Sequence, residues 1–308
     1  MKKSIFVMLV LVTLLGCKTE PPEPPAPPET SELNGATYEL EWEDNFEKNR
    51  IVSTCFDGSK HSTGWWIYQQ DWGAARANSE YKIWASKFDD NVVLKDGKLK
   101  LTVRTDHDAK ICSGGEVFSY ELFQLKDSMW EIRFKIPKTT DGDWFVFNIQ
   151  PRSKKGDFPP YYVTDKVWTQ EFTAIETEPR RGRYRGSEYL WNEEHEQDPN
   201  YVDSSAGRYT GEWGDPWSYV EMTDDFYDVW HTLKYVWDKN EIIGYMDGEE
   251  VYRKPKCAEL KQADDDDLYG AFYLAVDVIG ECDGPVNLDM PTHSCYIDYV
   301  KVWRKIKK

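Results

Sequence analysis

The sequence predicts an all-β protein built from two stacked antiparallel sheets. Two observations support this fold class: short segments alternate apolar and polar residues with the period of two that a strand requires, and turn residues separate these segments. No segment shows a helical repeat of useful length or a βαβ alternation. The chain from about Asn34 to Lys308 has the size of one large β domain with a full core.

The N-terminal segment MKKSIFVMLVLVTLLGCKTE has the order of a secretory signal. A basic head precedes the apolar run IFVMLVLVTLL, which is too short to span a bilayer. Leu14-Leu15-Gly16-Cys17 resembles a bacterial lipobox, which implies that residues 1–16 are removed and that Cys17 receives a lipid. The alternative is an ordinary signal with an incidental cysteine.

A proline-rich segment, PPEPPAPPETSE, follows the signal. We expect residues 17–34 to form an extended linker and residues 35–308 to form the folded, catalytic domain. The lipid is the expected contact with a membrane, which places the protein at the bacterial outer membrane or cell surface.

Four segments that alternate apolar and polar residues predict the strands, in chain order. NVVLKDGKLKLTVRT predicts two strands around Asp96-Gly97, with Leu99, Leu101 and Val103 on the buried face. MWEIRFKIP repeats the alternation, HTLKYVWDKNEIIGYMDGEEVY predicts two strands and an Asp-Gly turn, and YIDYVKVW predicts a last strand.

The composition excludes some partners. A formal net charge of -17 disfavours nucleic acid, because phosphate binding needs clustered Lys and Arg. Aromatic residues make up 15% of the chain and include 14 Trp, which suits the binding of flat sugar rings. Five cysteines follow Cys17. In an oxidising location they allow two bridges and one unpaired thiol, with Cys282 and Cys295 as the preferred pair. We expect a monomer.

Six segments stand in the order and spacing of one family: WEDNF, NVVLKDGKLKL, FKIP, HTLKYVWDKNEIIGYMDG, FYLAVDV and YIDYVKVW. The chain resembles glycoside hydrolase family 16, the laminarinase, agarase and carrageenase group, over most of the domain. This resemblance implies a curved jelly-roll, concanavalin A-like sandwich whose concave face is a cleft for a β-linked polysaccharide. It also implies a signature strand Glu-x-Asp-x-x-Glu, and the segment EFTAIE, from Glu171 to Glu176, stands at that position.

Three glutamates, Glu171, Glu176 and Glu178, occur where the other residues favour a strand. One explanation is a strand face that looks at water. The other is chemical: Glu171 and Thr173 share a face by alternation, and a β-bulge would return Glu176 to that face. Two carboxyl groups about 5 to 5.5 Å apart suit a retaining glycosidase, and the resemblance implies Glu171 as nucleophile and Glu176 as acid/base. Pro179 ends the strand, so Glu178 is expected to be structural or at the rim.

The sequence departs from the family pattern at two positions. Thr173 stands where the family has Asp; its hydroxyl can donate to Glu171 but adds no negative charge to the pair. Asn148 in GDWFVFNI replaces a tryptophan expected at the cleavage subsite, and Asn148 and Trp144 are candidate substrate contacts. These departures keep open a second hypothesis, a surface lipoprotein that binds glycan without cutting it.

The segment EPRRGRYRG is basic in an acidic chain. Guanidinium groups suit sulfate esters and uronates, so Arg181 and Arg183 are candidate substrate contacts; the alternative is a solvated loop that balances charge. The segment GWWIYQQDWGAARANSEYKIW resembles the agarase, porphyranase and carrageenase branch. The expected activity is therefore endo-acting, retaining hydrolysis of an algal, sulfated galactan, with β-1,3-glucan as the alternative substrate.

Further residues are candidates for the sugar site. Asn78 and His231 stand near family positions that line the cleft, and Trp168 is expected in the core or cleft wall. No cofactor is expected for catalysis. The resemblance implies a structural calcium ion, with Asp298 as its candidate ligand. Stacking candidates in loop-like segments are Trp65, Trp66, Trp72, Trp84, Trp191, Trp213 and Trp217. The large number of tryptophans in loop-like segments argues against a third hypothesis, a structural sandwich without a ligand.

Overall fold

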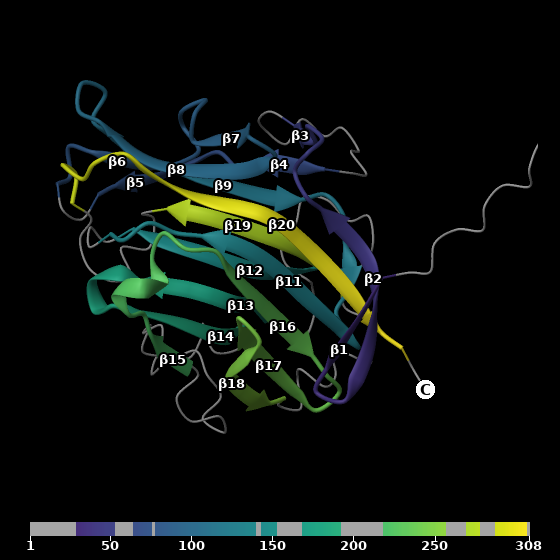
Figure 1. Ribbon diagram of the computed structural model, residues 1–308. Coiled ribbons are helices and arrows are strands. Elements are labelled where there is room, and N and C mark those ends of the chain that lie inside the picture. The colour runs from purple at the N-terminus through teal and green to yellow at the C-terminus, as the bar shows by residue number, and fades with distance from the viewer. Residues whose placement is uncertain are drawn as a thin grey trace, which may run out of the picture.

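The computed structural model describes residues 29–52, 64–75, 78–139, 143–152, 168–191, 218–256, 269–277 and 287–306. These residues form curved, mainly antiparallel sheets that pack face to face (Figure 1). Helical structure within the described ranges consists of two short 3-10 turns, η1 (Pro179–Arg181) and η2 (Asp224–Phe226). The all-β fold class predicted from the sequence is therefore confirmed. None of the described helices is long and apolar enough to cross a membrane.

One layer, sheet A, is built around the long last strand β20. Its first half pairs with β8, its second half with β2, and its other edge with β11. The strands of sheet A are β1 (Thr30–Leu33), β2 (Ala36–Asp44), β7 (Val92–Lys95), β8 (Lys98–Asp106), β11 (Ser128–Lys135), β16 (His231–Trp237), β17 (Glu241–Met246), β18 (Glu249–Pro255) and β20 (His293–Lys305).

The other layer, sheet B, contains the segment with the three glutamates. Its spatial order runs β15, β14, β13, β12, β19, β9, β4 and β3, with β10 also paired to β19. The strands of sheet B are β3 (Ile51–Val52), β4 (Trp65–Ile67), β9 (Ile111–Ser119), β10 (Phe123–Gln124), β12 (Trp144–Arg152), β13 (Trp168–Glu178), β14 (Arg183–Trp191), β15 (Ser218–Glu221) and β19 (Tyr269–Asp277).

The two sheets are linked along one side. The first half of β9 pairs with β8 of sheet A, and its second half pairs with β19 of sheet B. Strands β5 (Gln70–Ala74) and β6 (Lys82–Ala85) extend this junction. Two short pairings, β3 with β4 and β6 with β9, are parallel, which the sequence pattern did not predict.

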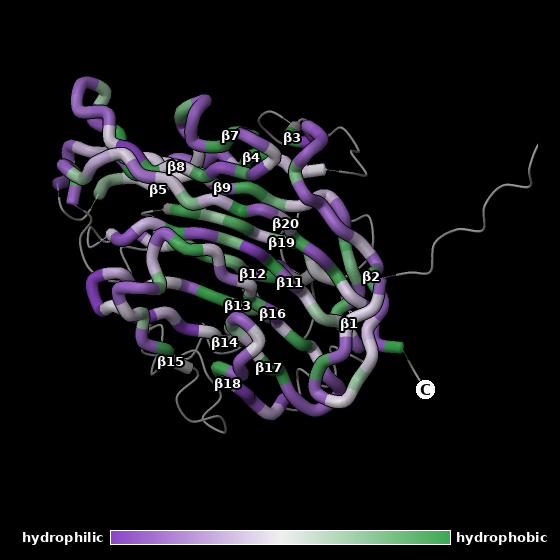
Figure 2. Tube along the Cα trace, viewed as in Figure 1, coloured by the Kyte–Doolittle hydropathy of each residue, from purple (hydrophilic) through white to green (hydrophobic). Residues whose placement is uncertain are grey.

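Aromatic pairs join the facing layers. Trp130 of β11 lies 4.7 Å from Phe272 of β19, measured between ring centroids, and Phe172 of β13 lies 4.5 Å from Trp237 of β16. All four side chains are buried. Hydrophobic and hydrophilic residues alternate along many of the strands (Figure 2), as expected for strands with one face in a core. Because Phe172 is buried against Trp237 of the facing sheet, the face of β13 that carries Phe172 points into the core.

The predicted hairpin turns are present. Asp96 and Gly97 between β7 and β8 both have positive φ, 53° and 67°, as do Asp247 and Gly248 between β17 and β18, 52° and 87°. Two consecutive positive φ values are those of the type I′ turn that matches strand twist. The segment from His231 contains three strands, where two were predicted, because β17 pairs with both β16 and β18.

Two expectations need correction. Sheet A already begins at Thr30, since β1 pairs with β2, so Thr30–Leu33 belong to the folded domain and not to the linker. Cys295 is a buried free thiol, so the preferred bridge to Cys282 is wrong; Cys282 itself lies outside the described residues. Burial raises the pKa of the Cys295 thiol.

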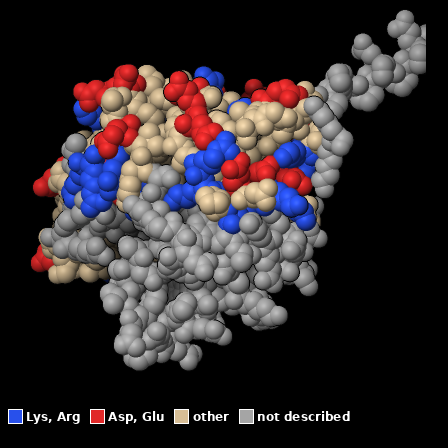
Figure 3. All heavy atoms as spheres, turned by 90° about the horizontal axis from the view of Figure 1, so that it is seen from below, with Lys and Arg blue, Asp and Glu red and all other residues tan. Residues whose placement is uncertain are grey.

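Charged side chains of both signs cover the described surface. On the face shown in Figure 3, acidic and basic groups lie next to one another. Ion pairs such as Lys82–Asp71 and Lys138–Asp224, each with 2.6 Å between nitrogen and oxygen, are examples of this pairing. Local pairing of this kind reduces repulsion between neighbouring carboxylates, while the net charge of the chain stays at -17.

Candidate functional site

Strand β13 contains the predicted bulge. Thr173 pairs with Ser187 of β14 and Glu176 pairs with Arg185, so three steps on β13 face two steps on β14. The same extra residue appears against β12, where Asn148 pairs with Thr173 and Phe147 pairs with Ile175. A bulge of this kind shifts the alternation by one position.

The bulge brings the signature positions to one face. Phe172, Ala174 and Ile175 belong to the hydrophobic core, and the alternation together with the bulge turns Thr173 and Glu176 to the opposite face. The backbone alternation places position 171 on the outer side with Thr173. The face of sheet B opposite the core, here called the outer face of sheet B, therefore carries the three signature positions. The side chain of Glu171 lies outside the described part of the chain.

The neighbouring strand β12 adds polar groups to this face. Asn148 lies directly opposite Thr173, and Val146 lies opposite Glu176. Trp144, two positions before Val146, is on the same face by alternation and is half-buried. The structure therefore places Asn148 and Trp144 on the same face of adjacent strands as Thr173 and Glu176.

The candidate acid/base is ion-paired. The Arg185 guanidinium on β14 donates to the Glu176 carboxylate, and its other terminal nitrogen lies 3.3 Å from Glu178 Oε1. Glu176 is 2% exposed and Glu178 1%. Buried carboxylates need such partners, because an unpaired buried charge is costly. Glu178 is thus structural, as expected.

The arginines predicted to hold an anion also contact Glu178. Arg183 Nε lies 2.5 Å from Glu178 Oε2, and Arg181 Nη1 lies 3.2 Å from the same oxygen. The Arg183 guanidinium also lies over the ring of Tyr219, 3.7 Å from its centroid. The resulting arginine–glutamate cluster, made of Arg181, Arg183, Arg185, Glu176 and Glu178, corresponds more closely to the charge-balancing alternative than to an open anion grip.

Aromatic side chains continue the outer face of sheet B on the other side of β12. Phe118 of β9 pairs in register with Trp66 of β4 and with Tyr273 of β19, which in turn lies opposite Asn148. The Trp66 and Phe118 rings stack with centroids 4.8 Å apart, and Phe118 and Tyr273 are 4.6 Å apart. From Trp66 to Thr173 there are four steps between strands, or about 19 Å.

This aromatic cluster also reaches an exposed residue. Tyr68 contacts Phe118 and Trp72, with centroid distances of 5.6 and 5.8 Å, and Trp72 is 40% exposed. The Tyr273 hydroxyl donates to the buried Glu116 carboxylate over 2.8 Å. The sequence analysis missed Phe118, Tyr273 and Glu116. Their alternation within β9 and β19 was visible, but their adjacency depends on the register between distant strands.

Other predicted residues lie elsewhere. Asn78 is exposed in the turn before β6, where its side chain accepts the Glu80 N–H. His231 begins β16 in sheet A and contacts Asp247 and the Phe226 carbonyl oxygen, which are structural partners. Trp168 pairs with Trp191 at the start of β13, and the side chains of both lie outside the described residues, as do all of Trp213 and Trp217.

One tryptophan assignment was wrong. Trp65 is fully buried in the core, because it points inward from β4 while its neighbour Trp66 points outward. Trp230, which precedes β16, is half-buried and has Arg133 5.4 Å and Lys135 5.6 Å from its ring centroid.

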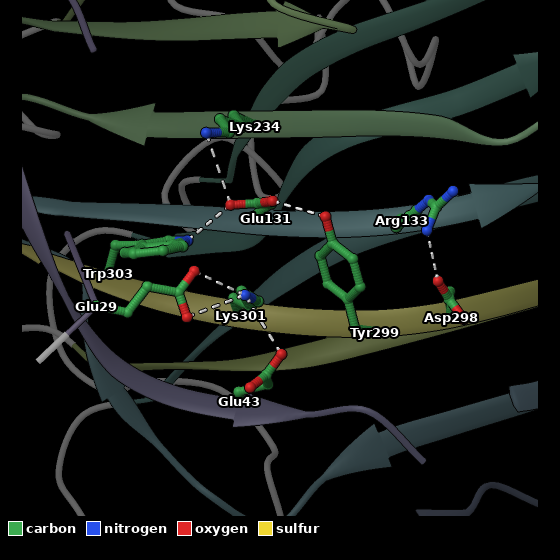
Figure 4. A network of polar contacts seen from close by, with 9 residues as sticks. All are labelled: Glu29, Glu43, Glu131, Arg133, Lys234, Asp298, Tyr299, Lys301 and Trp303. Carbon is green, nitrogen blue, oxygen red and sulfur yellow. Dashed lines mark hydrogen bonds and ion pairs between the residues drawn. The ribbon is translucent and has the colours of Figure 1, made fainter. Parts of the chain in front are cut away.

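Asp298 does not fit a calcium site. Its carboxylate pairs with Arg133 over 2.9 Å and with Lys98 over 3.1 Å, so two cations already neutralise it (Figure 4 shows the Arg133 pair). Calcium needs several oxygen ligands. Among the described residues, no cluster of three or more His, Cys, Asp or Glu could hold a metal ion.

Comparisons with known proteins find the same fold. No family model matches the sequence, and no curated protein sequence matches it. The structure is similar to an endo-β-1,3-glucanase from Pyrococcus furiosus, with a TM-score of 0.58, 17% identity and coverage of 91% of this chain and 100% of that one.

Other solved structures give similar values. A laminarinase from Flavobacterium sp. UMI-01 has a TM-score of 0.58 at 16% identity, with coverage of 86% of this chain and 100% of that one. A structure from work on endo-acting O-glycanases of the human gut microbiota, which initiate mucin breakdown, has a TM-score of 0.56 at 16% identity, with coverage of 86% and 98%. At this identity the likeness establishes a shared fold.

Proposed function

We propose that the protein is an endo-acting, retaining glycoside hydrolase that cleaves a β-linked polysaccharide. The observation that carries the proposal is the bulge in β13, which places positions 171 and 176 on one face across from Asn148. Two carboxylic acids are the groups that retaining hydrolysis requires. Glu171 is proposed as the nucleophile, and Glu176 as the acid that protonates the leaving oxygen and then the base that activates water.

A β-1,3-glucan is the substrate we would test first. The similar structures include an endo-β-1,3-glucanase and a laminarinase, which supports this choice. The sulfated galactan remains the second candidate, although Arg181 and Arg183, which were to hold its sulfate, bond to Glu178. The aromatic cluster from Trp66 to Tyr273 would suit the flat faces of either sugar chain.

An oligosaccharide-release assay tests the proposal. The panel contains laminarin, mixed-linkage β-glucan, agar, porphyran, carrageenan and mucin O-glycans, the last because of the gut O-glycanase structure. Glu171→Gln and Glu176→Gln should each abolish release and leave binding in place, because the amide keeps the shape and loses the chemistry. Full activity in both variants would refute this site.

Glycan binding without turnover is the second candidate function. The Arg185–Glu176 ion pair and the threonine at position 173 favour it, since both reduce the capacity of Glu176 to act as an acid. A protein that binds one glycan of the panel and releases nothing from it at any pH would have this function.

The location is a separate proposal. The lipobox-like segment supports a lipid on Cys17 and attachment to the outer membrane or cell surface; Cys17 lies outside the described residues. Mass analysis of the mature protein should find Cys17 as the first residue with acyl chains attached. Cleavage elsewhere without an acyl chain would contradict the anchor.

A further inference from the structure

The arginine–glutamate cluster gives one buried guanidinium two carboxylates. Arg185 is 8% exposed and lies between Glu176, which it contacts with Nη2, and Glu178, which is 3.3 Å from Nη1. Glu176 and Arg185 are also register partners on adjacent strands, so the backbone holds the two side chains opposite each other. This contact is therefore part of the sheet and does not depend on a flexible loop.

Glu178 does not depend on Arg185 alone as its cationic partner, so Arg185 can also pair with Glu176. Arg183 and Arg181 both contact Glu178 Oε2, so the charge of Glu178 already has two other partners. Three guanidinium groups thus face two carboxylates in the cluster. Contact with the guanidinium groups favours the charged form of both carboxylates, whereas their burial favours the neutral form.

Residues on the adjacent strands complete the described surroundings of the cluster. On β12 the residue opposite Glu176 is the uncharged Val146. On β15, Tyr219 lies opposite Arg185, and Glu221 lies opposite Arg183. On β13 itself, Glu171 occupies the same face five positions earlier. A carboxylate at position 171 favours a proton on Glu176, whereas the direct contact with Arg185 disfavours one.

We propose that Arg185 is a positioning residue that holds Glu176 as a carboxylate. A general acid must carry its proton before it meets the glycosidic oxygen. The site would therefore release product best at acidic pH, and turnover would decline towards neutral pH as Glu176 loses its proton. This catalytic consequence rests on the proposed function; the charge state of Glu176 does not.

Two measurements on the same proteins test the proposal. Carboxyl ¹³C NMR of glutamate-labelled protein follows the titration of Glu176, whose signal is identified by its absence in Glu176→Gln. The pH profile of kcat/KM follows turnover. In Arg185→Gln, the titration midpoint of Glu176 and the alkaline limb of the profile should both move up by about one pH unit or more.

Arg253→Gln is the matched control. Arg253 on β18 also lies between two glutamates, Glu241 and Glu250, but it belongs to sheet A and makes no described contact with the cluster. Its substitution should leave the Glu176 titration and the profile unchanged. Thermal unfolding establishes that each variant is folded at the pH values used.

The outcomes separate the two proposals. A folded Arg185→Gln protein with an unchanged Glu176 titration would overturn the role of Arg185. If that variant does not fold, the wild-type protein still decides: a Glu176 midpoint at or above that of an ordinary glutamate overturns the proposal. If the titration moves as expected but no protein releases product at any pH, Arg185 sets the charge of Glu176 and the hydrolase proposal alone fails.

Discussion

Asn148 on β12 lies directly opposite Thr173 on β13, and both side chains are buried on the outer face of sheet B. The Thr173 hydroxyl has no hydrogen-bond partner among the described residues. A buried hydroxyl without a partner costs free energy of folding, and such groups are uncommon in native proteins. Thr173, one of the two positions at which the sequence differs from the signature that it resembles, is thus also a position of unsatisfied polarity.

Thr173→Val should raise the free energy of unfolding by roughly 1 to 2 kcal/mol, because valine has a similar shape and removes the unpartnered hydroxyl. Chemical denaturation measures the change. Thr177→Val on the same strand is the control: the Thr177 hydroxyl accepts the Phe145 N–H over 2.8 Å, so its loss should lower stability. Equal effects of the two substitutions would show that the Thr173 hydroxyl has a partner after all.

The sequence predicted what depends on local pattern. The period of two identified the buried face of β8, and the spacing of Glu171, Thr173 and Glu176 predicted the bulge in β13. Neither needs knowledge of a neighbouring strand. Trp65 and Trp66 were both assigned to a loop-like segment, so the opposite orientations that they have in β4 were not predicted.

Contacts that depend on register could not be predicted. Arg185 meets Glu176 because η1 and Gly182, which has a positive φ of 61°, turn the chain so that β14 returns alongside β13. Trp66, Phe118 and Tyr273 become neighbours only through pairings between segments far apart in sequence. A shift of one residue in either pairing would reverse the faces, and composition does not fix it.

Glu131→Ala should lower the free energy of unfolding by about 3 kcal/mol. Glu131 is buried on the side of sheet A away from the core and accepts hydrogen bonds from Tyr299 and Trp303, while Lys234 Nζ lies 3.7 Å away (Figure 4). Removal of the carboxylate takes away the acceptor of the Tyr299 hydroxyl and of the Trp303 N–H, whereas Lys234 Nζ keeps its hydrogen bond to Ser31 Oγ. Glu41→Ala, which breaks an exposed pair with Arg304, should cost at most about 1 kcal/mol. Similar losses in both variants by denaturation would show that the network adds nothing beyond a surface pair.

Trp72→Ala should weaken the affinity for the cognate glycan about three- to tenfold and leave the fold stable, because Trp72 is the exposed end of the aromatic cluster. Calorimetric titration with the glycan identified by the panel measures the change. The control is Trp230→Ala, because Trp230 is half-buried among cations that belong to sheet A. Unchanged affinity in Trp72→Ala, or an equal loss in Trp230→Ala, would exclude the cluster as a sugar platform.

Two carboxylic acids should make opposite contributions to the pH dependence of stability. Burial raises the pKa of Glu121, whose Oε2 accepts the Gly64 N–H over 3.0 Å. The folded state therefore holds the Glu121 proton more tightly than the unfolded state. The contribution of Glu121 is present below its unfolded pKa and is lost as pH rises through its folded pKa. Burial is the largest single effect on Asp238 and acts in the same direction, but the hydrogen bond and charge of Lys305, together with the backbone hydrogen bonds of Asn240 and Lys239, outweigh it and lower the Asp238 pKa. Its contribution is present above the unfolded pKa and is lost as pH falls through the folded one.

Glu121→Gln should accordingly make the protein more stable than the parent at neutral pH, because the amide carries no charge to desolvate and can still accept from Gly64. The advantage should shrink as pH falls into the range where Glu121 is protonated. Asp238→Asn should do the reverse, with a loss of stability at neutral pH that shrinks in acid as the parent's own Asp238 is protonated. Unfolding curves of the three proteins from pH 3 to pH 8 measure both slopes. If the two variants differ from the parent by amounts that do not change with pH, their effects come from packing, and neither carboxyl group is coupled to folding in the way its surroundings imply.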